Sequence, residues 1–308
     1  MVNDRGLTVK RAPSWATIVG DMSQLRCVAE RLGHPQGPDV AADGSVVFAE
    51  TYTGRILRWD AVRGITTVAD VGGGPNAARF GPDGFLYVTQ NGGQAAQWRS
   101  SRQRTPALQR LLLGDDGTAT GPPQTVLTGV AGVSFCAPHD LAFGPDGTVY
   151  LTDSGAWDPE RRPDQGRIIA VDPDGTGRVV AETGATFPSG VAVDAEGTLL
   201  WCECYTNRVI RLRPGGVPEV LCTLPEEQLP ESLLLGADGT IWIAGLFAGG
   251  IVVLDSRGRQ IDLIETGGLP LNCVLSGKTL YVTDLGDYDD DRPDDEAQMV
   301  GRLLEVAL

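Results

Sequence analysis

PHDLAFGPDGTVYLTD, from Pro138 to Asp153, is one copy of a motif that occurs six times in this chain. In each copy a proline opens an apolar strand, a tight turn follows, and a second apolar strand runs back. The other copies read PQGPDVAADGSVVFAE from Pro35, PNAARFGPDGFLYVTQ from Pro75, PSGVAVDAEGTLLWCE from Pro188, PESLLLGADGTIWIAG from Pro230 and PLNCVLSGKTLYVTD from Pro270. The turn glycines at positions 44, 84, 147, 197 and 239 are 40, 63, 50 and 42 residues apart. These intervals suit propeller blades of about 40–50 residues, with insertions in two of them.

The sequence after each motif supplies two further strands, for example GRIIAVD (166–172) and GRVVAET (177–183). Four strands joined in order make one blade. We therefore predict an all-β, six-bladed β-propeller of four-stranded antiparallel blades, forming a single domain over residues 1–308. The runs at 25–32 and 301–308 are predicted to pair in one blade and close the ring.

Composition limits the classes of partner. The formal net charge is -15 and the pI is about 4.5, which argues against nucleic acid because phosphate binding needs a basic face. No apolar run reaches membrane-spanning length, and the first ten residues lack the apolar core of a signal peptide. Arginine greatly outnumbers lysine, a bias typical of a GC-rich bacterial genome. We expect a cytoplasmic bacterial protein that acts on a small molecule without a membrane partner, and its oligomeric state stays open.

The six cysteines have no CxxC pair and no zinc-type spacing, so we expect buried free thiols. They stand at positions 27, 136, 202, 204, 222 and 273. Cys136 and Cys273 lie beside the residues assigned to the site below.

The two ends of the blades differ in their loops. The motif turns are short and uniform, whereas the loops after the second strands are long and variable, as at 91–110, 154–166 and 285–301. Variable loops at one end of a rigid scaffold are typical of a binding face. The arginine-rich loop 91–110 could act as a lid, bind an anionic group or pair with the acidic loop, and the acidic run 287–296 is expected to be solvated.

The residue after each opening proline is predicted to face the channel at this variable end. These residues are Gln36, Asn76, His139, Ser189 and Glu231, with Asn272 as the equivalent one position later in the sixth motif. All six are polar and the residues that follow are mostly apolar, so we predict a polar ligand site above an apolar tunnel.

Chemistry assigns roles within this ring. His139 and Glu231 are the predicted catalytic residues, because imidazole and carboxylate groups can move protons near neutral pH. The substrate-binding residues are predicted to be Asn76, Asn272, Gln36 and Ser189. His34 is expected to be structural or at the rim, and Asp140 is expected to point away from the channel.

The six motifs together resemble the senescence marker protein/gluconolactonase/luciferin-regenerating enzyme family. The resemblance covers nearly the whole chain, and its most specific stretches are PQGP at 35–38, PNAARFGPDGFLYVTQNGG at 75–93, PHDLAFGPDGTVYLTDSG at 138–155 and LPLNCVL at 269–275. It implies a divalent metal, often calcium, at the channel mouth, and hydrolysis of lactones or related esters.

The chain departs from the family pattern at all four of the ligand positions compared. Gln36 replaces a glutamate, His139 and Ser189 each replace an asparagine, and Glu231 replaces an aspartate. By resemblance these four residues would be the metal ligands. One carboxylate is a poor set for calcium, whereas an imidazole suits zinc or another softer metal. A softer metal, weak metal binding and a metal-free site therefore remain open.

Three functions follow from this pattern. The leading hypothesis is a lactonase-type hydrolase in which Glu231 or His139 activates water, with or without a metal. The second is a non-hydrolytic acid/base enzyme, a lyase, isomerase or cyclase of specialised metabolism, that uses His139 and Glu231 without a strong metal site. The third is a non-enzymatic binding propeller.

Overall fold

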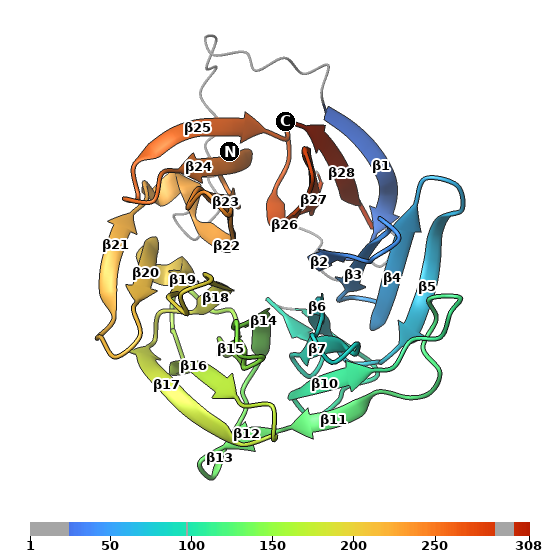
Figure 1. Cartoon of the computed structure of the whole chain (residues 1–308), viewed down its shortest axis with the longest axis horizontal. Helices are drawn as coiled ribbons and strands as arrows, with labels where there is room; N and C mark the ends of the chain where they lie inside the picture. The colour runs from blue at the N-terminus through green and yellow to red at the C-terminus, as the bar shows by residue number, and fades with distance from the viewer. Residues whose placement is uncertain (1–24, 97, 287–298) are drawn as a thin grey trace.

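The chain folds into six four-stranded antiparallel sheets around a central channel (Figure 1). The computed structural model describes residues 25–96, 98–286 and 299–308. Each sheet is one propeller blade, so the predicted all-β, six-bladed architecture is confirmed. The described residues contain two short 3-10 helices, η2 (Cys204–Thr206) and η3 (Glu226–Gln228). No helix in this part of the chain is long and apolar enough to cross a membrane.

The first three blades are built from consecutive strands, with one short insertion. Blade 1 contains β2 (Pro35–Val40), β3 (Val46–Glu50), β4 (Arg55–Asp60) and β5 (Gly64–Asp70). Blade 2 contains β6 (Pro75–Phe80), β7 (Leu86–Gln90), β10 (Ala107–Leu111) and β11 (Gln124–Leu127), with the hairpin β8 (Gln94–Ala95) and β9 (Trp98–Arg99) between its second and third strands. Blade 3 contains β14 (Pro138–Phe143), β15 (Val149–Asp153), β16 (Gly166–Val171) and β17 (Gly177–Gly184), after the hairpin β12 (Gly129–Val130) and β13 (Val133–Ser134).

The last three blades complete the circle. Blade 4 contains β18 (Pro188–Val193), β19 (Leu199–Glu203), β20 (Arg208–Leu212) and β21 (Glu219–Thr223). Blade 5 contains β22 (Pro230–Leu235), β23 (Ile241–Gly245), β24 (Gly250–Leu254) and β25 (Gln260–Glu265). Blade 6 contains β26 (Pro270–Ser276), β27 (Thr279–Asp284), β28 (Gly301–Ala307) and β1 (Leu25–Leu32).

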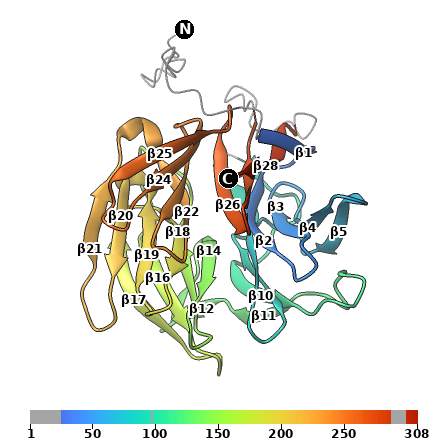
Figure 2. The same cartoon turned by 45° about the horizontal axis from the view of Figure 1, so that its top comes forward.

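Blade 6 joins the two ends of the described chain. Its outer strand β1 pairs antiparallel with β28, which places Leu25 opposite Val306 and Cys27 opposite Leu304 (Figure 2). The predicted ring closure between 25–32 and 301–308 is confirmed. Because every blade then has two neighbours, the ring has no terminal blade with an uncovered face.

The hydrophobic core lies between adjacent blades. Val47 and Ile56 of blade 1, for example, pack with Leu86 and Val88 of blade 2, and all four side chains are almost completely buried. The inner strands are covered on both faces, which explains why the second strand of each motif reads as a continuous apolar run.

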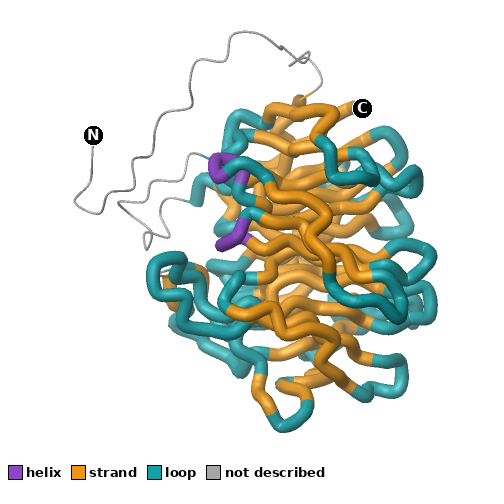
Figure 3. The backbone as a smooth tube through the Cα atoms, turned by 90° about the vertical axis from the view of Figure 1, so that its left-hand side faces the viewer, coloured by secondary structure: helices purple, strands orange, loops and turns teal. Residues whose placement is uncertain are grey.

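Loops gather on the two faces of the disc, and the strands run between them (Figure 3). The motif turns occupy one face, where the glycines at 44, 84, 147, 197 and 239 have φ values of 81–84°, a conformation that favours glycine. The other face carries the predicted variable loops. The first of these is shorter than expected, because β10 begins at Ala107, and most of 285–301 lies outside the described residues.

An irregularity in strand pairing follows each opening proline. In blade 3 the register shifts between Pro138 and Leu141, and in blade 5 between Pro230 and Ser232, with similar shifts in the other four blades. A bulge inserts an extra residue and redirects side chains, so two consecutive residues can face the channel. This local geometry determines which residues form the site.

Candidate functional site at the channel mouth

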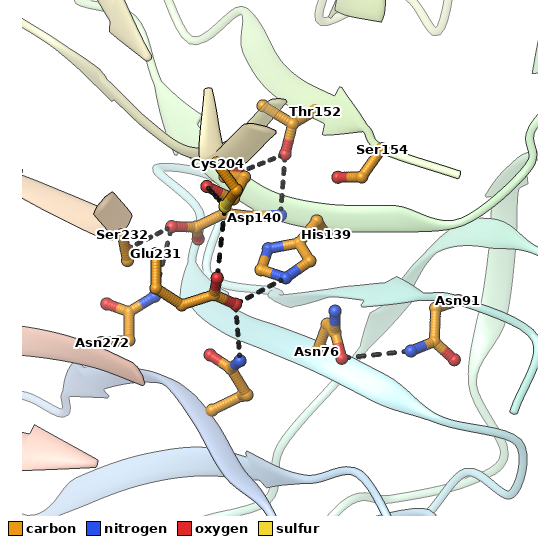
Figure 4. A network of polar contacts seen from close by, with 12 residues as sticks. Asn76, Asn91, His139, Asp140, Thr152, Ser154, Cys204, Glu231, Ser232 and Asn272 are labelled. Carbon is orange, nitrogen blue, oxygen red and sulfur yellow. Dashed lines mark hydrogen bonds and ion pairs between the residues drawn. The ribbon is translucent and has the colours of Figure 1, made fainter. Parts of the chain in front are cut away.

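Three of the predicted ring residues meet inside the channel, and they come from alternate blades. Gln36 lies on β2 of blade 1, His139 on β14 of blade 3 and Glu231 on β22 of blade 5. Nε2 of His139 is 3.2 Å from Oε1 of Glu231, and the Gln36 amide donates a hydrogen bond of 3.5 Å to the same oxygen (Figure 4). All three side chains are buried. The propeller thus joins residues that are up to 195 positions apart.

A thiol and a hydroxyl complete the surroundings of Glu231. Sγ of Cys204 is 3.3 Å from Oε2 of Glu231 and 3.1 Å from Oγ of Ser189, and both Cys204 and Ser189 are within 3.3 Å of the Pro230 carbonyl oxygen. Burial, followed by the negative charge of Glu231, raises the pKa of the Cys204 thiol well above its usual value. Cys204 therefore stays protonated and can donate its S–H.

Asn76 is held in one orientation at the edge of this group. Its Oδ1 accepts a hydrogen bond of 3.2 Å from the Asn91 amide, and the Thr51 hydroxyl lies 3.3 Å from the same oxygen. The Asn76 nitrogen lies on the other side of its amide, away from Asn91 (Figure 4). Among the described residues this NH₂ group has no hydrogen-bond acceptor, so it is available to an oxygen of a bound molecule.

Asn272 does not lie at the same level as the other five predicted residues. Its Nδ2 donates a hydrogen bond of 3.2 Å to Asp140, and Leu271 occupies the position after the opening proline. The strand pairing explains the difference. Asn272 pairs with Thr283 in blade 6, and the residue with the equivalent pairing in blade 5 is Ser232, which pairs with Ala244. Ser232 lies one residue beyond Glu231, so Asn272 is equivalent to Ser232 and not to Glu231. Asn272 is therefore part of a second layer.

The channel below the ring is polar near its mouth, which corrects the expectation of an apolar tunnel. The carboxylate of Asp140 accepts hydrogen bonds of 3.1 Å from Ser232, 3.2 Å from Asn272 and 3.5 Å from Arg79. The expectation that Asp140 points away from the channel is also wrong, since the bulge after Pro138 turns it inward beside His139. The partly buried Arg79 forms an ion pair with the buried Asp140 beneath the His139–Glu231 contact.

Cys204 is the contact of Glu231 that sequence reasoning missed. A signal existed, because Cys204 directly follows β19 at the variable end, as Thr51 follows β3 and Ser154 follows β15. Each of these three side chains lies within hydrogen-bond distance of the carbonyl of the next blade's opening proline. By contrast, the Cys136 thiol interacts with the Arg167 side chain, and the Cys273 thiol makes no hydrogen bond with other described residues.

Both histidines of the chain lie near the channel mouth. Burial lowers the pKa of His34 to about 4, while the negative charge of Glu231 raises it and His139 lowers it further. His34 is thus within electrostatic reach of both residues and is neutral at neutral pH. Its Nδ1 is buried without a hydrogen-bond partner among the described residues.

The arginine-rich loop is partly tied to blade 1. Arg102 forms an ion pair of 2.8 Å with Asp70 and donates a hydrogen bond to the Thr53 carbonyl. Arg110 lies on β10, 3.6 Å from Asp83 at the opposite end of the blade. The acidic run 287–296, one of the partners considered for this loop, lies outside the described residues.

The ring residues do not fit calcium. Calcium takes six to eight oxygen ligands and gains affinity with each carboxylate, whereas the ring contains one carboxylate, Glu231. Both of its oxygens already face hydrogen-bond donors: His139 and Gln36 at Oε1, and Cys204 at Oε2. For zinc, three or more His, Cys, Asp or Glu ligands would have to converge on one point. His139, Glu231 and Cys204 contact one another, but neither they nor other such residues in the part of the chain that the structure describes form a group that could hold a metal ion.

The six-bladed fold is that of a known class of propeller. Residues 34–285 match the model of the SMP-30/gluconolactonase/LRE-like region, and the chain belongs to this family. A gluconolactonase from Zymomonas mobilis is 22% identical over 317 residues, covering 90% of this chain and 83% of the relative.

Solved structures show the same fold. A gluconolactonase from Xanthomonas campestris superimposes with a TM-score of 0.71 at 20% identity, covering 92% of this chain and 89% of the other. A calcium-binding protein from Agrobacterium tumefaciens, a regucalcin, superimposes with a TM-score of 0.69 at 18% identity, covering 89% and 90% of the two chains.

Proposed function

We propose that this protein is a hydrolase that opens a lactone or a related ester by water attack at the channel mouth, without a resident metal. The observation that carries the proposal is the buried contact of 3.2 Å between His139 and Glu231 in a gluconolactonase-like propeller. A buried imidazole held against a carboxylate is a recurrent arrangement for general base catalysis.

The contact with Glu231 determines which nitrogen of His139 acts. A proton on Nε2 is favoured, because a lone pair there would face the negative carboxylate. With that proton on Nε2, the lone pair of the imidazole is on Nδ1, which no described residue hydrogen-bonds. In the proposed reaction Nδ1 removes a proton from water, the resulting hydroxide attacks the carbonyl carbon, and Glu231 stabilises the imidazolium.

Asn76 is the proposed donor to the carbonyl oxygen. Asn91 donates to its Oδ1, so its NH₂ group is oriented before a substrate binds. Such a pre-oriented donor stabilises the negative oxygen that develops after water attack.

Water attack gives a tetrahedral intermediate. As this intermediate collapses, the C–O ester bond breaks and the His139 imidazolium returns its proton to the leaving alkoxide, so that lactone and water give a hydroxy acid. Gln36 and Ser189 support this arrangement by contacting Glu231 and its thiol partner.

The proposal is tested by removing each member of the pair. We expect Glu231→Gln and His139→Asn each to lower kcat/KM for small lactones by about 10²–10⁴-fold, the usual contribution of general base catalysis. Glu203→Gln is the matched control, because Glu203 is buried at the end of β19 but accepts a hydrogen bond from Thr206. Folded Glu231→Gln protein with wild-type activity would remove Glu231 from the mechanism.

The poor fit to a metal favours one alternative, the non-hydrolytic acid/base enzyme. With the same pair, His139 could remove a proton from carbon and break a C–O bond by elimination, which needs no activated water. The two reactions differ in the source of the product oxygen, since only hydrolysis transfers an oxygen atom from solvent to the product carboxylate.

A further inference from the structure

Two groups of aromatic side chains flank the site on opposite sides of the ring. The blade-1 aromatic group consists of His34 and Tyr52 at blade 1 and Trp98 of the β8–β9 hairpin in blade 2. The ring centroids of His34 and Tyr52 are 5.1 Å apart, and those of Tyr52 and Trp98 are 5.0 Å apart. The blade-4 aromatic group consists of Phe187 and Tyr205 at blade 4 and Trp157 of the loop between β15 and β16 in blade 3. The ring centroid of Tyr205 is 5.3 Å from that of Phe187 and 5.2 Å from that of Trp157. Blades 1 and 4 face each other across the channel (Figure 1).

The two groups are built in the same way. His34 and Phe187 each precede an opening proline and have left-handed backbones, with φ values of 59° and 53°. Tyr52 and Tyr205 each stand two residues beyond a second strand, and the interplanar angle to the preceding ring is 43° in both groups. Left-handed φ is uncommon for a bulky residue, and such strain tends to persist at functional sites.

Both groups adjoin the proposed catalytic pair. The ring of Phe187 meets the ring of His139 edge to face, with centroids 5.7 Å apart. On the other side, the charges of Glu231 and His139 both act on His34. The aromatic side chains are therefore next to the reacting groups at the same end of the channel.

The blade-4 group presents ring surface with little free polarity. The Tyr205 hydroxyl accepts a hydrogen bond of 2.7 Å from the Asp158 backbone and lies 3.4 Å from the Ala156 carbonyl, so its own loop satisfies it. The guanidinium of Arg162 lies over the Tyr205 ring at 5.1 Å. Trp157 and Tyr205 remain partly exposed. Such surfaces favour a flat π-system, because aromatic pairs gain energy beyond the area they bury.

We infer that the substrate is an aryl-substituted lactone or ester, whose aromatic ring binds between the blade-1 and blade-4 groups while its carbonyl lies over His139 and Asn76. The inference rests on the proposed hydrolysis and specifies the substrate class. It distinguishes this chain from an enzyme for polyhydroxylated sugar lactones, whose hydroxyl groups would need several free polar partners beside the blade-4 rings.

The experiment compares 5-phenyl-δ-valerolactone with 5-cyclohexyl-δ-valerolactone, which have similar size and the same ring to open. We expect wild-type protein to prefer the phenyl compound by roughly 2- to 10-fold in kcat/KM, the gain typical of an aromatic contact. Trp157→Leu is expected to abolish most of this preference and Trp157→Phe to retain it. Phe85→Leu is the control, because Phe85 contacts Arg110 at the opposite end of blade 2.

Binding is measured separately from turnover with the ring-opened product 5-hydroxy-5-phenylpentanoate, by calorimetry. Product binding that weakens in Trp157→Leu but not in Phe85→Leu supports the aromatic site, whether or not a lactone is hydrolysed. If such binding is seen and no lactone is hydrolysed, the proposed hydrolase function is rejected and the aromatic site is retained. The inference is overturned if the phenyl and cyclohexyl lactones are hydrolysed at equal rates, or if glucono-δ-lactone is hydrolysed faster. Either result would still support the proposed hydrolase function. If neither turnover nor binding is observed, both are rejected.

Discussion

Cys204 occupies a position where blades 1 and 3 have hydroxyl groups. Thr51 and Ser154 lie within hydrogen-bond distance of the next opening proline, and the Cys204 thiol reaches Pro230 and also Glu231. A hydroxyl can make the same contacts as the thiol, whereas an alkyl group would leave the carboxylate without this donor.

We therefore predict that Cys204→Ser keeps kcat/KM within about threefold of wild type, while Cys204→Val lowers it about tenfold or more. A hydrogen bond to a charged group contributes about 1.5–3 kcal/mol, which sets the size of the loss. Cys222→Val is the control, since this half-buried thiol packs against the apolar core between blades 4 and 5. Equal activity of the serine and valine variants would show that the thiol has no role at Glu231.

His34 should make stability depend on pH. Its pKa is lowered from 6.5 to about 4 mainly by burial, so the unfolded chain binds this proton more readily than the folded protein does. The contribution of neutral His34 to the free energy of unfolding is complete above pH 6.5. It falls as the pH decreases towards 4, by roughly 3 kcal/mol in total.

The measurement compares wild type with His34→Asn by urea unfolding between pH 7.5 and 4. Asparagine tolerates the left-handed backbone at this position. As the pH falls from 6.5 to 4, the free energy of unfolding of wild type should decrease by about 2–3 kcal/mol relative to that of the variant. A difference that is constant with pH would contradict a buried neutral His34.

At the scale of the strands, threonines join blade 2 to blade 3 and blade 3 to blade 4. The Thr152 hydroxyl on β15 donates a hydrogen bond of 2.6 Å to the Ser189 carbonyl and accepts one of 3.0 Å from the Asp140 amide. Thr89 on β7 similarly donates to the His139 carbonyl at 2.7 Å. These bonds hold the bulged backbone of one blade against the second strand of its neighbour.

Thr152→Val should therefore destabilise the protein by about 2–5 kcal/mol, because two buried backbone groups lose their partner and each costs about 1–3 kcal/mol. Thr125→Val on the exposed outer strand β11 should change the free energy of unfolding by no more than about 0.5 kcal/mol. Chemical unfolding of both variants measures the difference, and equal stabilities would contradict a linking role for Thr152.

The bulges also explain what sequence reasoning about the strands could not resolve. Simple alternation placed Asp140 outside the channel, whereas the register shift after Pro138 brings both His139 and Asp140 inside. The same shift separates Asn272 from the first layer. A bulge depends on the pairing of two strands, so the identity of single residues does not reveal it.

At the scale of the whole molecule, the fold could be predicted because its signal is repeated. Six proline-led motifs and a recurring turn glycine define six blades, and the ends at 25–32 and 301–308 complete the last one. The residues facing the channel mouth could be proposed from the same repeat. Their mutual contacts could not, because Gln36, His139 and Glu231 come from three separate blades and meet only after the ring closes.

The central claim is that His139 and Glu231 activate water for ester opening without a metal. The most direct test is hydrolysis of a small δ-lactone by exhaustively chelated protein in H₂¹⁸O, with metal content measured in the same sample. The account predicts an unchanged rate and one ¹⁸O atom in each product carboxylate. A rate abolished by chelation and restored by calcium, or a product without ¹⁸O, would contradict it.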